Sequence, residues 1–197
     1  MADTRDPYLE DRRKLDLAWR LLRHGARTQT ISRWTGLSAR RVRSLLKKYR
    51  TRSAELKFQR PRGDSPFNME LLLRSPRRRL EAALLATIHQ ELRAQSGVQP
   101  PDFRPELGAG ELACKAYEAF REREPQSVLS IDQAFLVLST IGRNGEFALG
   151  RCPCCDAPML IDRLAVLRRC GNCSATISLP GHSAEVEPDR TALLPSG

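Results

Sequence analysis

The chain has 197 residues, enough for one substantial core or two small ones and too few for several large domains. Hydrophobic residues make up 41% of it and aromatic residues only 6%, which favours a mainly α-helical fold over a β-sandwich. The formal net charge of +10 favours an anionic partner such as nucleic acid. Because no run of about 18 apolar residues or export signal is visible, we expect a cytoplasmic protein that does not enter membranes.

A helical module is predicted near the N-terminus, after a charged segment at residues 1–14. Residues 15–50 have the apolar spacing of helices, interrupted by two glycine turns, and predict three helices with helix-turn-helix organisation. Gly36 supplies the bend before the third helix, and Ser38 is a suitable N-cap for it. The third helix has an i, i+3, i+4, i+7 apolar face formed by Val42, Leu45, Leu46 and Tyr49.

The opposite face of the predicted third helix is basic, as in a recognition helix that enters the major groove of DNA. Arginine can bind guanine edges with two hydrogen bonds, while other cations neutralise phosphates. The alternative is a solvated basic face on an ordinary helical bundle. The predicted DNA contacts are Arg27, Thr28, Arg33, Ser38, Arg40, Arg41, Arg43, Ser44, Lys47 and Lys48.

The middle of the chain is predicted to form a second helical region. Residues 51–66 are basic and contain prolines, which indicates a linker. Residues 67–149 return to helical periodicity and are expected to form a helical core and partner-binding region. Prolines and glycines between Ser96 and Gly110 predict a loop inside it. The predicted helices are Arg77–Gln95, Glu111–Arg123 and one that starts near Ser130 or Ile131.

Two local patterns in this region have structural explanations. Ser130 and Gln133 have the spacing of a capping box. The basic run Arg77–Arg79 is expected at a solvated helix start, with phosphate contact as the alternative. We see no constellation of catalytic residues, so we expect neither enzymatic activity nor a small-molecule substrate.

Four of the six cysteines form two Cys-x2-Cys pairs separated by fourteen residues, Cys152 with Cys155 and Cys170 with Cys173. This spacing is typical of structural zinc, and it predicts one Zn²⁺ ion with these four ligands. Four thiolates leave no open coordination position, which argues against catalytic zinc. The alternatives are an iron–sulfur cluster and a redox dithiol.

Residues 150–179 are predicted to form a small zinc-ribbon-like region around this ion. Met159–Ile161 and Ala165–Leu167 can form a hairpin, and Ala175–Leu179 can add a third strand. So small a region cannot bury enough apolar surface alone, so metal binding is expected to supply much of its folding free energy. Cys154 lies so close to Cys152 and Cys155 that a Cys-x-Cys pairing is an alternative.

Two other segments are not expected to bind metal. Cys114 is expected to be a core residue. Residues 180–197 are expected to form a disordered tail.

Several of these motifs resemble the flagellar transcriptional activator FlhC family. They are Gly25-Ala26-Arg27, Leu37-Ser38, Tyr49, Pro66-Phe67 and the run Cys152-Pro153-Cys154-Cys155 followed by a second cysteine pair. The resemblance covers roughly Leu15 to Cys173. It implies the zinc ligands named above and a bacterial regulator that works with FlhD in a heterohexamer of four FlhD and two FlhC chains. It also implies binding to promoters of flagellar operons and recruitment of RNA polymerase.

Two functional hypotheses follow from the sequence. The first is the DNA-binding subunit of a transcription activator, which explains both the basic helix and the cysteine pairs. The second is a zinc-containing scaffold or interaction subunit whose partner supplies the DNA sequence readout. Because the aromatic-rich stretch expected after Pro66-Phe67 is replaced by Met69–Leu73 and Arg77–Arg79, a diverged regulator of non-flagellar genes is a further alternative.

Overall fold

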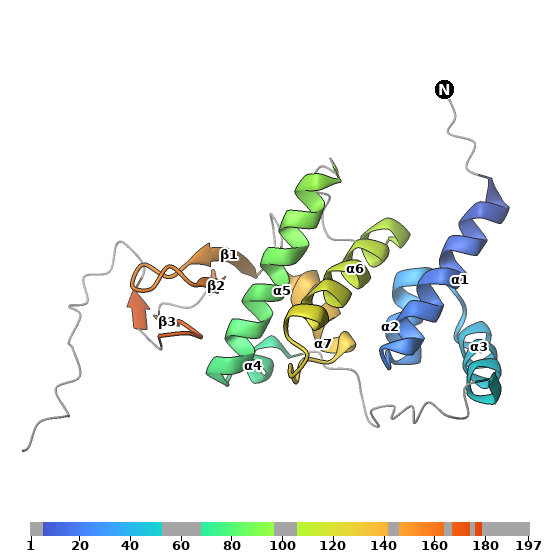
Figure 1. The fold of residues 1–197 in the computed structure, drawn as a ribbon, viewed down its shortest axis with the longest axis horizontal. Helices are drawn as coiled ribbons and strands as arrows, with labels where there is room; N and C mark the ends of the chain where they lie inside the picture. Colours follow the sequence, from blue (N-terminus) through green and yellow to red (C-terminus); the bar gives the residue numbers. More distant parts are fainter. Residues whose placement is uncertain are drawn as a thin grey trace, which may run out of the picture.

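The computed structural model describes residues 6–52, 68–96, 106–141, 146–163, 167–173 and 176–178. In this part the chain is mainly helical, as predicted, with two antiparallel two-stranded sheets near its C-terminal end. The first three helices lie at one end of the molecule and the strands at the other, with α5, α6 and α7 between them (Figure 1). The predicted tail at 180–197 and most of the predicted linker lie outside the described residues.

The helices are α1 (Pro7–Arg23), α2 (Thr28–Thr35), α3 (Ala39–Arg52), α4 (Met69–Leu72), α5 (Pro76–Gln95), α6 (Leu107–Arg123) and α7 (Ile131–Thr140). The strands are β1 (Phe147–Arg151), β2 (Pro158–Asp162), β3 (Leu167–Arg169) and β4 (Thr176–Ser178). Among the described helices, none combines the length and the apolar composition required to cross a membrane.

Local capping explains where two helices begin. The Asp6 side chain accepts a hydrogen bond from the Tyr8 N–H at 3.0 Å and Pro7 occupies the first helical position, so α1 starts earlier than predicted. Most of the segment predicted to precede the helical module is therefore part of α1. At α7, Ser130 and Gln133 form the predicted capping box in both directions.

The start of α6 corrects the predicted loop between Ser96 and Gly110. The helix begins at Leu107, so its first turn contains glycine residues that the sequence placed in the loop. A Cβ atom added at Gly110 would lie 3.0 Å from a Leu17 methyl group and 3.3 Å from the Cβ of Trp34. Glycine at this position therefore allows α6 to approach α1 and α2 closely.

One apolar core joins the N-terminal helices to the rest of the molecule. Apolar side chains of α1, α2 and α3 belong to the same cluster as those of α4 to α7 and β1. Trp34 of α2 packs against Phe135 of α7 edge to face, with ring centroids 5.1 Å apart. The N-terminal helices therefore share their core with the rest of the molecule. Among the described residues, the largest fully buried side chains of this shared core include Leu17, Leu21, Leu22, Ile31, Phe120 and Leu138.

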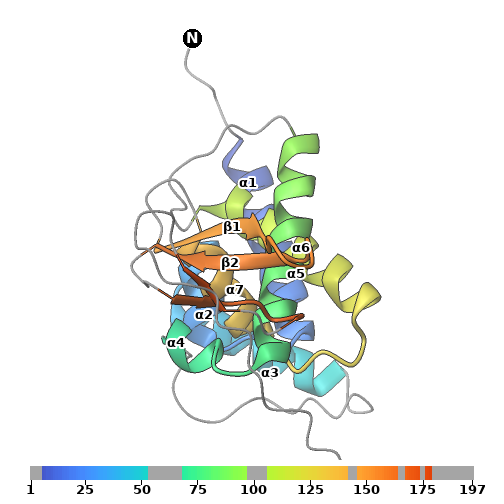
Figure 2. The ribbon, with the colours of Figure 1, turned by 90° about the vertical axis from the view of Figure 1, so that its left-hand side faces the viewer.

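The strands pair differently from the prediction. β1 pairs with β2, from Phe147 opposite Asp162 to Arg151 opposite Pro158, and β3 pairs separately with β4. Met159–Ile161 therefore pair with β1 instead of the predicted partner Ala165–Leu167, of which only Leu167 lies within the described residues, and β4 lies within the predicted third strand. Both strands of the first sheet contact α5, and the sheets lie in front of this helix in Figure 2.

Candidate metal centre and nucleic-acid interface

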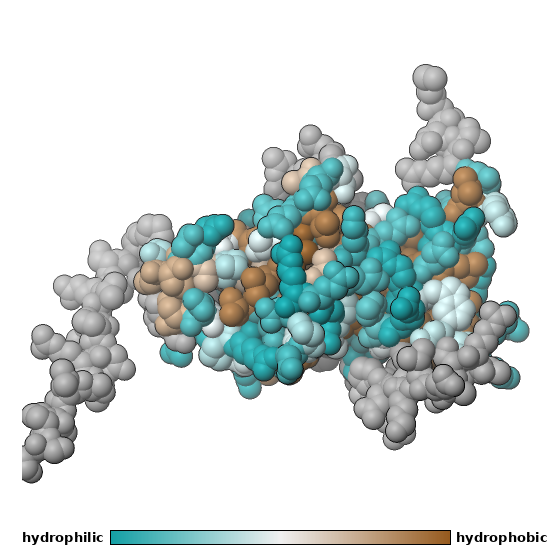
Figure 3. Space-filling view, in the orientation of Figure 1, coloured by the Kyte–Doolittle hydropathy of each residue, from teal (hydrophilic) through white to brown (hydrophobic). Residues whose placement is uncertain are grey.

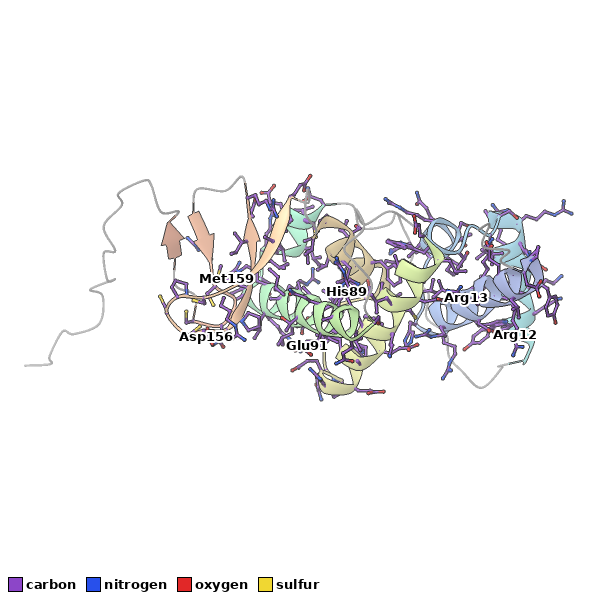
Figure 4. The ribbon with its side chains drawn as sticks, turned by 90° about the horizontal axis from the view of Figure 1, so that it is seen from above. Arg12, Arg13, His89, Glu91, Asp156 and Met159 are labelled. Carbon is purple, nitrogen blue, oxygen red and sulfur yellow. The ribbon has the colours of Figure 1, made fainter. Side chains whose placement is uncertain are left out.

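The four predicted ligands meet at one point. The Sγ atoms of Cys152, Cys155, Cys170 and Cys173 all lie within 4.8 Å of one another. The Cys152 to Cys173 and Cys155 to Cys170 Sγ distances are both 3.7 Å. A tetrahedral zinc site with Zn–S bonds of about 2.3 Å needs sulfur atoms about 3.8 Å apart. The cluster can therefore hold one metal ion, and its dimensions suit Zn²⁺; sulfur atoms gather in the loops near Asp156 in Figure 4.

Two tight turns, here called knuckles, aim the sulfur atoms at this point. In the first knuckle, between β1 and β2, the Asp156 N–H donates to the Cys152 carbonyl at 2.8 Å, and the Cys152 N–H donates to the Ala157 carbonyl at 2.9 Å. Asp156 has a φ of 56°, a left-handed conformation that reverses the chain. In the second knuckle, after β3, the Asn172 N–H donates to the Cys170 Sγ atom at 3.3 Å.

Amide groups around the cluster favour thiolates. The backbone N–H of Ala157 and the side chain of Asn172 lower the pKa of Cys155 to about 6. Burial acts to raise the pKa of Cys152, but hydrogen bonds from the backbone of Cys154 and Cys155 lower it overall. Because metal binding requires deprotonated thiols, this environment prepares the sulfur atoms as ligands. Sequence reasoning missed Asn172, whose only signal was its position between the second pair of cysteines.

The two remaining cysteines do not belong to the cluster. Cys154 is exposed and lies outside the group of four, which supports the Cys-x2-Cys pairing over a Cys-x-Cys pairing. Cys114 is fully buried on α6, and burial raises the pKa of its thiol to about 12. It therefore remains a neutral core side chain, as expected.

The second knuckle rests directly on the first turns of α5. A Cβ atom added at Gly171 would lie 2.6 Å from the backbone nitrogen of Leu80 and 2.8 Å from the carbonyl oxygen of Pro76. No larger residue fits here without movement of the backbone. The metal-binding knuckle and the helical core are thus in close contact at Gly171.

The predicted recognition helix has one buried face and one basic face. Val42 and Tyr49 are buried, with exposed fractions of 0% and 8%. Gly36 ends α2 in the left-handed conformation with a φ of 71°, and the Ser38 hydroxyl accepts a hydrogen bond from the Arg41 N–H at 3.3 Å. The predicted DNA contacts on α3 and its cap are all exposed: Ser38, Arg40, Arg41, Arg43, Ser44, Lys47 and Lys48.

Two of the predicted contacts are held by carboxylates of the protein. Arg27 donates to Asp132 of α7 from its backbone N–H and from its guanidinium group, each at 3.1 Å. Arg41 donates to both carboxylate oxygens of Asp11, at 2.8 and 2.6 Å. Thr28 is half-buried at the start of α2, and Arg33 is exposed on the same helix. Sequence reasoning did not single out Asp132, because a partner more than a hundred residues away leaves no local signal.

No protein-family model matches the chain, and no curated protein matches it. The resemblance to the FlhC family therefore stays a prediction. The residues themselves establish a four-cysteine centre that can hold one metal ion in a mainly helical protein.

Proposed function

We propose that the chain is the DNA-binding subunit of a transcription activator, with α2 and α3 as its helix-turn-helix and α3 as its recognition helix. The observation that carries this proposal is the charge on the exposed face of α3. Within the described residues, Arg40, Arg43 and Lys48 are exposed and have no carboxylate partner. Such cations on a helix anchored by its opposite face suit phosphate and guanine contacts.

The proposed interface is narrower than the set predicted from sequence. Arg27 is held by the buried Asp132, and Arg41 is paired with Asp11, so we leave both arginines out of the proposed interface. Ser38 caps α3. The side chains proposed to contact DNA are Thr28, Arg33, Arg40, Arg43, Ser44, Lys47 and Lys48.

The four-cysteine centre is proposed to bind structural Zn²⁺ within a zinc-ribbon-like region. Four thiolates at the observed separations would fill the tetrahedral coordination of the ion and would leave no position for a substrate or a water molecule. The ion would therefore stabilise the knuckles without taking part in a reaction, which agrees with a protein that is not an enzyme.

The proposed partners rest on the resemblance to the FlhC family. They are an FlhD-like subunit in a heterohexamer, promoters of flagellar operons and RNA polymerase, in the bacterial cytoplasm. The scaffold hypothesis differs in one measurable respect, because it assigns sequence readout to the partner rather than to α3.

Selection from a random-sequence duplex library tests the proposal, first with the purified metal-loaded chain and then with the FlhD-like subunit added. For a selected duplex, fluorescence anisotropy then compares wild type with an Arg40→Ala, Arg43→Ala variant. Loss of one base-reading arginine costs about 1–3 kcal/mol, so we expect the double variant to bind at least about tenfold more weakly.

A matched control replaces Arg23 and Arg123, which are exposed on α1 and α6, and changes the net charge equally. This control should bind nearly as tightly as wild type. If both variants lost the same amount of affinity for the duplex, the loss would be explained by the lower net charge alone. That result would contradict base readout by α3. Selection that yields no duplex, with or without the partner, would refute DNA binding altogether.

A further inference from the structure

A second basic surface forms where the metal-binding region meets α5. The contact at Gly171 places the second knuckle on the first turns of this helix, where the run Arg77–Arg79 lies. Burial lowers the pKa of Arg79, and the nearby charge of Arg169 on β3 lowers it further. Two cationic segments that are far apart in the sequence are therefore adjacent in space.

Some of these arginines serve the fold. Arg77 donates to Glu81 at 2.9 Å and to the Gln126 carbonyl at 2.6 Å. Arg79 donates to the backbone carbonyls of Leu73 and Arg74, each at 3.0 Å. These hydrogen bonds fix the start of α5 and leave Arg77 and Arg79 poorly placed to bind another molecule.

Three other arginines of this region, among those whose side chains the structure describes, are available. Arg74 and Arg169 are exposed and Arg78 is partly exposed, and no ion pair engages them among the described residues. The first turn of α5 contains no acidic residue. The surface over the start of α5 is hydrophilic in Figure 3. Glu81 and the cysteine cluster offset part of the positive charge of this region, but Arg74, Arg78 and Arg169 have no ion-pair partner among the described residues and can attract an anion.

We infer that Arg74, Arg78 and Arg169 form a second surface that binds the phosphate backbone of DNA. This inference rests on the proposed function and extends it, since it assigns the metal-binding region a direct part in DNA binding. The surface lies near the strands and α4, at the other end of the molecule from α3 (Figure 1). A duplex held by α3 reaches it only if the DNA extends well beyond the bases that α3 reads.

Backbone contacts of this kind are sequence-independent and strongly salt-dependent. Each neutralised phosphate adds about 0.9 to the slope of log affinity against log salt concentration. Loss of three such contacts should therefore reduce the slope by roughly two to three. A structural role for these arginines predicts a different outcome, namely lower stability with an unchanged salt slope.

The test uses metal-loaded full-length protein and two duplexes centred on the same selected site, about 15 and about 50 base pairs long, both well below the persistence length of DNA. An Arg74→Ala, Arg78→Ala, Arg169→Ala variant is compared with wild type. Its control replaces Arg23, Lys115 and Arg123, which removes the same charge from exposed positions elsewhere. Thermal melting of both variants verifies folding.

We expect the Arg74→Ala, Arg78→Ala, Arg169→Ala variant to bind the long duplex about tenfold more weakly than wild type, with the reduced salt slope. It should bind the short duplex as tightly as wild type does, and its melting temperature should be no lower. A long-duplex affinity equal to that of the control would overturn the inference. Equal losses on both duplexes would overturn it as well. In either of these cases wild type still binds DNA, so the proposed function survives, whereas wild type that binds neither duplex removes both.

Discussion

We expect Asp132 to make a large contribution to stability, because it connects α2 to α7 through hydrogen bonds to Arg27 and Thr30. Its side chain is 1% exposed and accepts hydrogen bonds from the Arg27 N–H, the Arg27 guanidinium and the Thr30 hydroxyl. An Asp132→Asn substitution keeps the shape of the side chain but removes its charge. One carboxylate oxygen becomes an NH₂ group, which is a donor and therefore cannot accept a hydrogen bond from Arg27 or Thr30. Breaking a buried charge pair costs about 3 kcal/mol, a large share of the roughly 5–15 kcal/mol that stabilises a typical domain.

Urea unfolding followed by far-UV circular dichroism measures this loss. Asp11→Asn is the matched control, because it breaks the exposed pair with Arg41 by the same chemical change. Exposed ion pairs contribute little, so the control should lose far less stability than Asp132→Asn. Similar losses in the two variants would refute the argument that burial makes the Asp132 pair important.

Three further outcomes are expected. Chelation, or the Cys170→Ser substitution, should remove one zinc ion per chain, as measured by elemental analysis, and should abolish the β-strand contribution to the far-UV circular dichroism spectrum. The Cys154→Ser control should retain the ion. Iron in the wild-type protein would contradict the zinc assignment. Gly171→Ala should lower the free energy of unfolding by about 1–3 kcal/mol, while Gly108→Ala, with no atom within 4 Å of the new Cβ, should not lower it. Equal stability of these two variants would mean that the knuckle does not rest on α5. Burial and the charge of Arg93 lower the pKa of His89 from 6.5 to about 4. Below pH 6.5 the unfolded chain therefore binds more protons at this residue than the folded chain does. The stability that is fully present above pH 6.5 is lost as the pH falls towards 4. Between pH 7 and pH 5 the loss is about 2 kcal/mol, and His89→Leu should largely remove it; an unchanged pH dependence in that variant would exclude His89 as the cause.

Features set by neighbouring residues could be predicted from the sequence. The capping box at Ser130 and the glycine turn at Gly36 depend on residues within a few positions of one another, and both are present. The cysteine pairs were equally informative, because two residues between ligands fix the geometry of each turn. The start of α1 was missed although Asp6-Pro7 is a standard initiation signal, since the charged composition of this segment hid its helical character.

Features set by distant residues could not be predicted in this way. Alternating apolar residues identify β2 as a strand but do not choose between β1 and β3 as its partner. That choice follows from the first knuckle, which reverses the chain between Arg151 and Pro158. The same limit applies to Asp132, whose partners lie on another helix, and to Gly110, whose close contacts with α1 and α2 appear only in the assembled core.

The shared core has a consequence for synthesis of the protein on the ribosome. Arg27 meets its partner Asp132 only after 105 further residues have been made, which takes about 5–20 s at ordinary rates of translation. For that interval the apolar faces of α1 and α2 lack the helices that cover them, while the cationic α3 is already available. A nascent chain stopped after α3 would therefore present a basic helix on an uncovered apolar surface, a combination that favours aggregation with RNA and other polyanions.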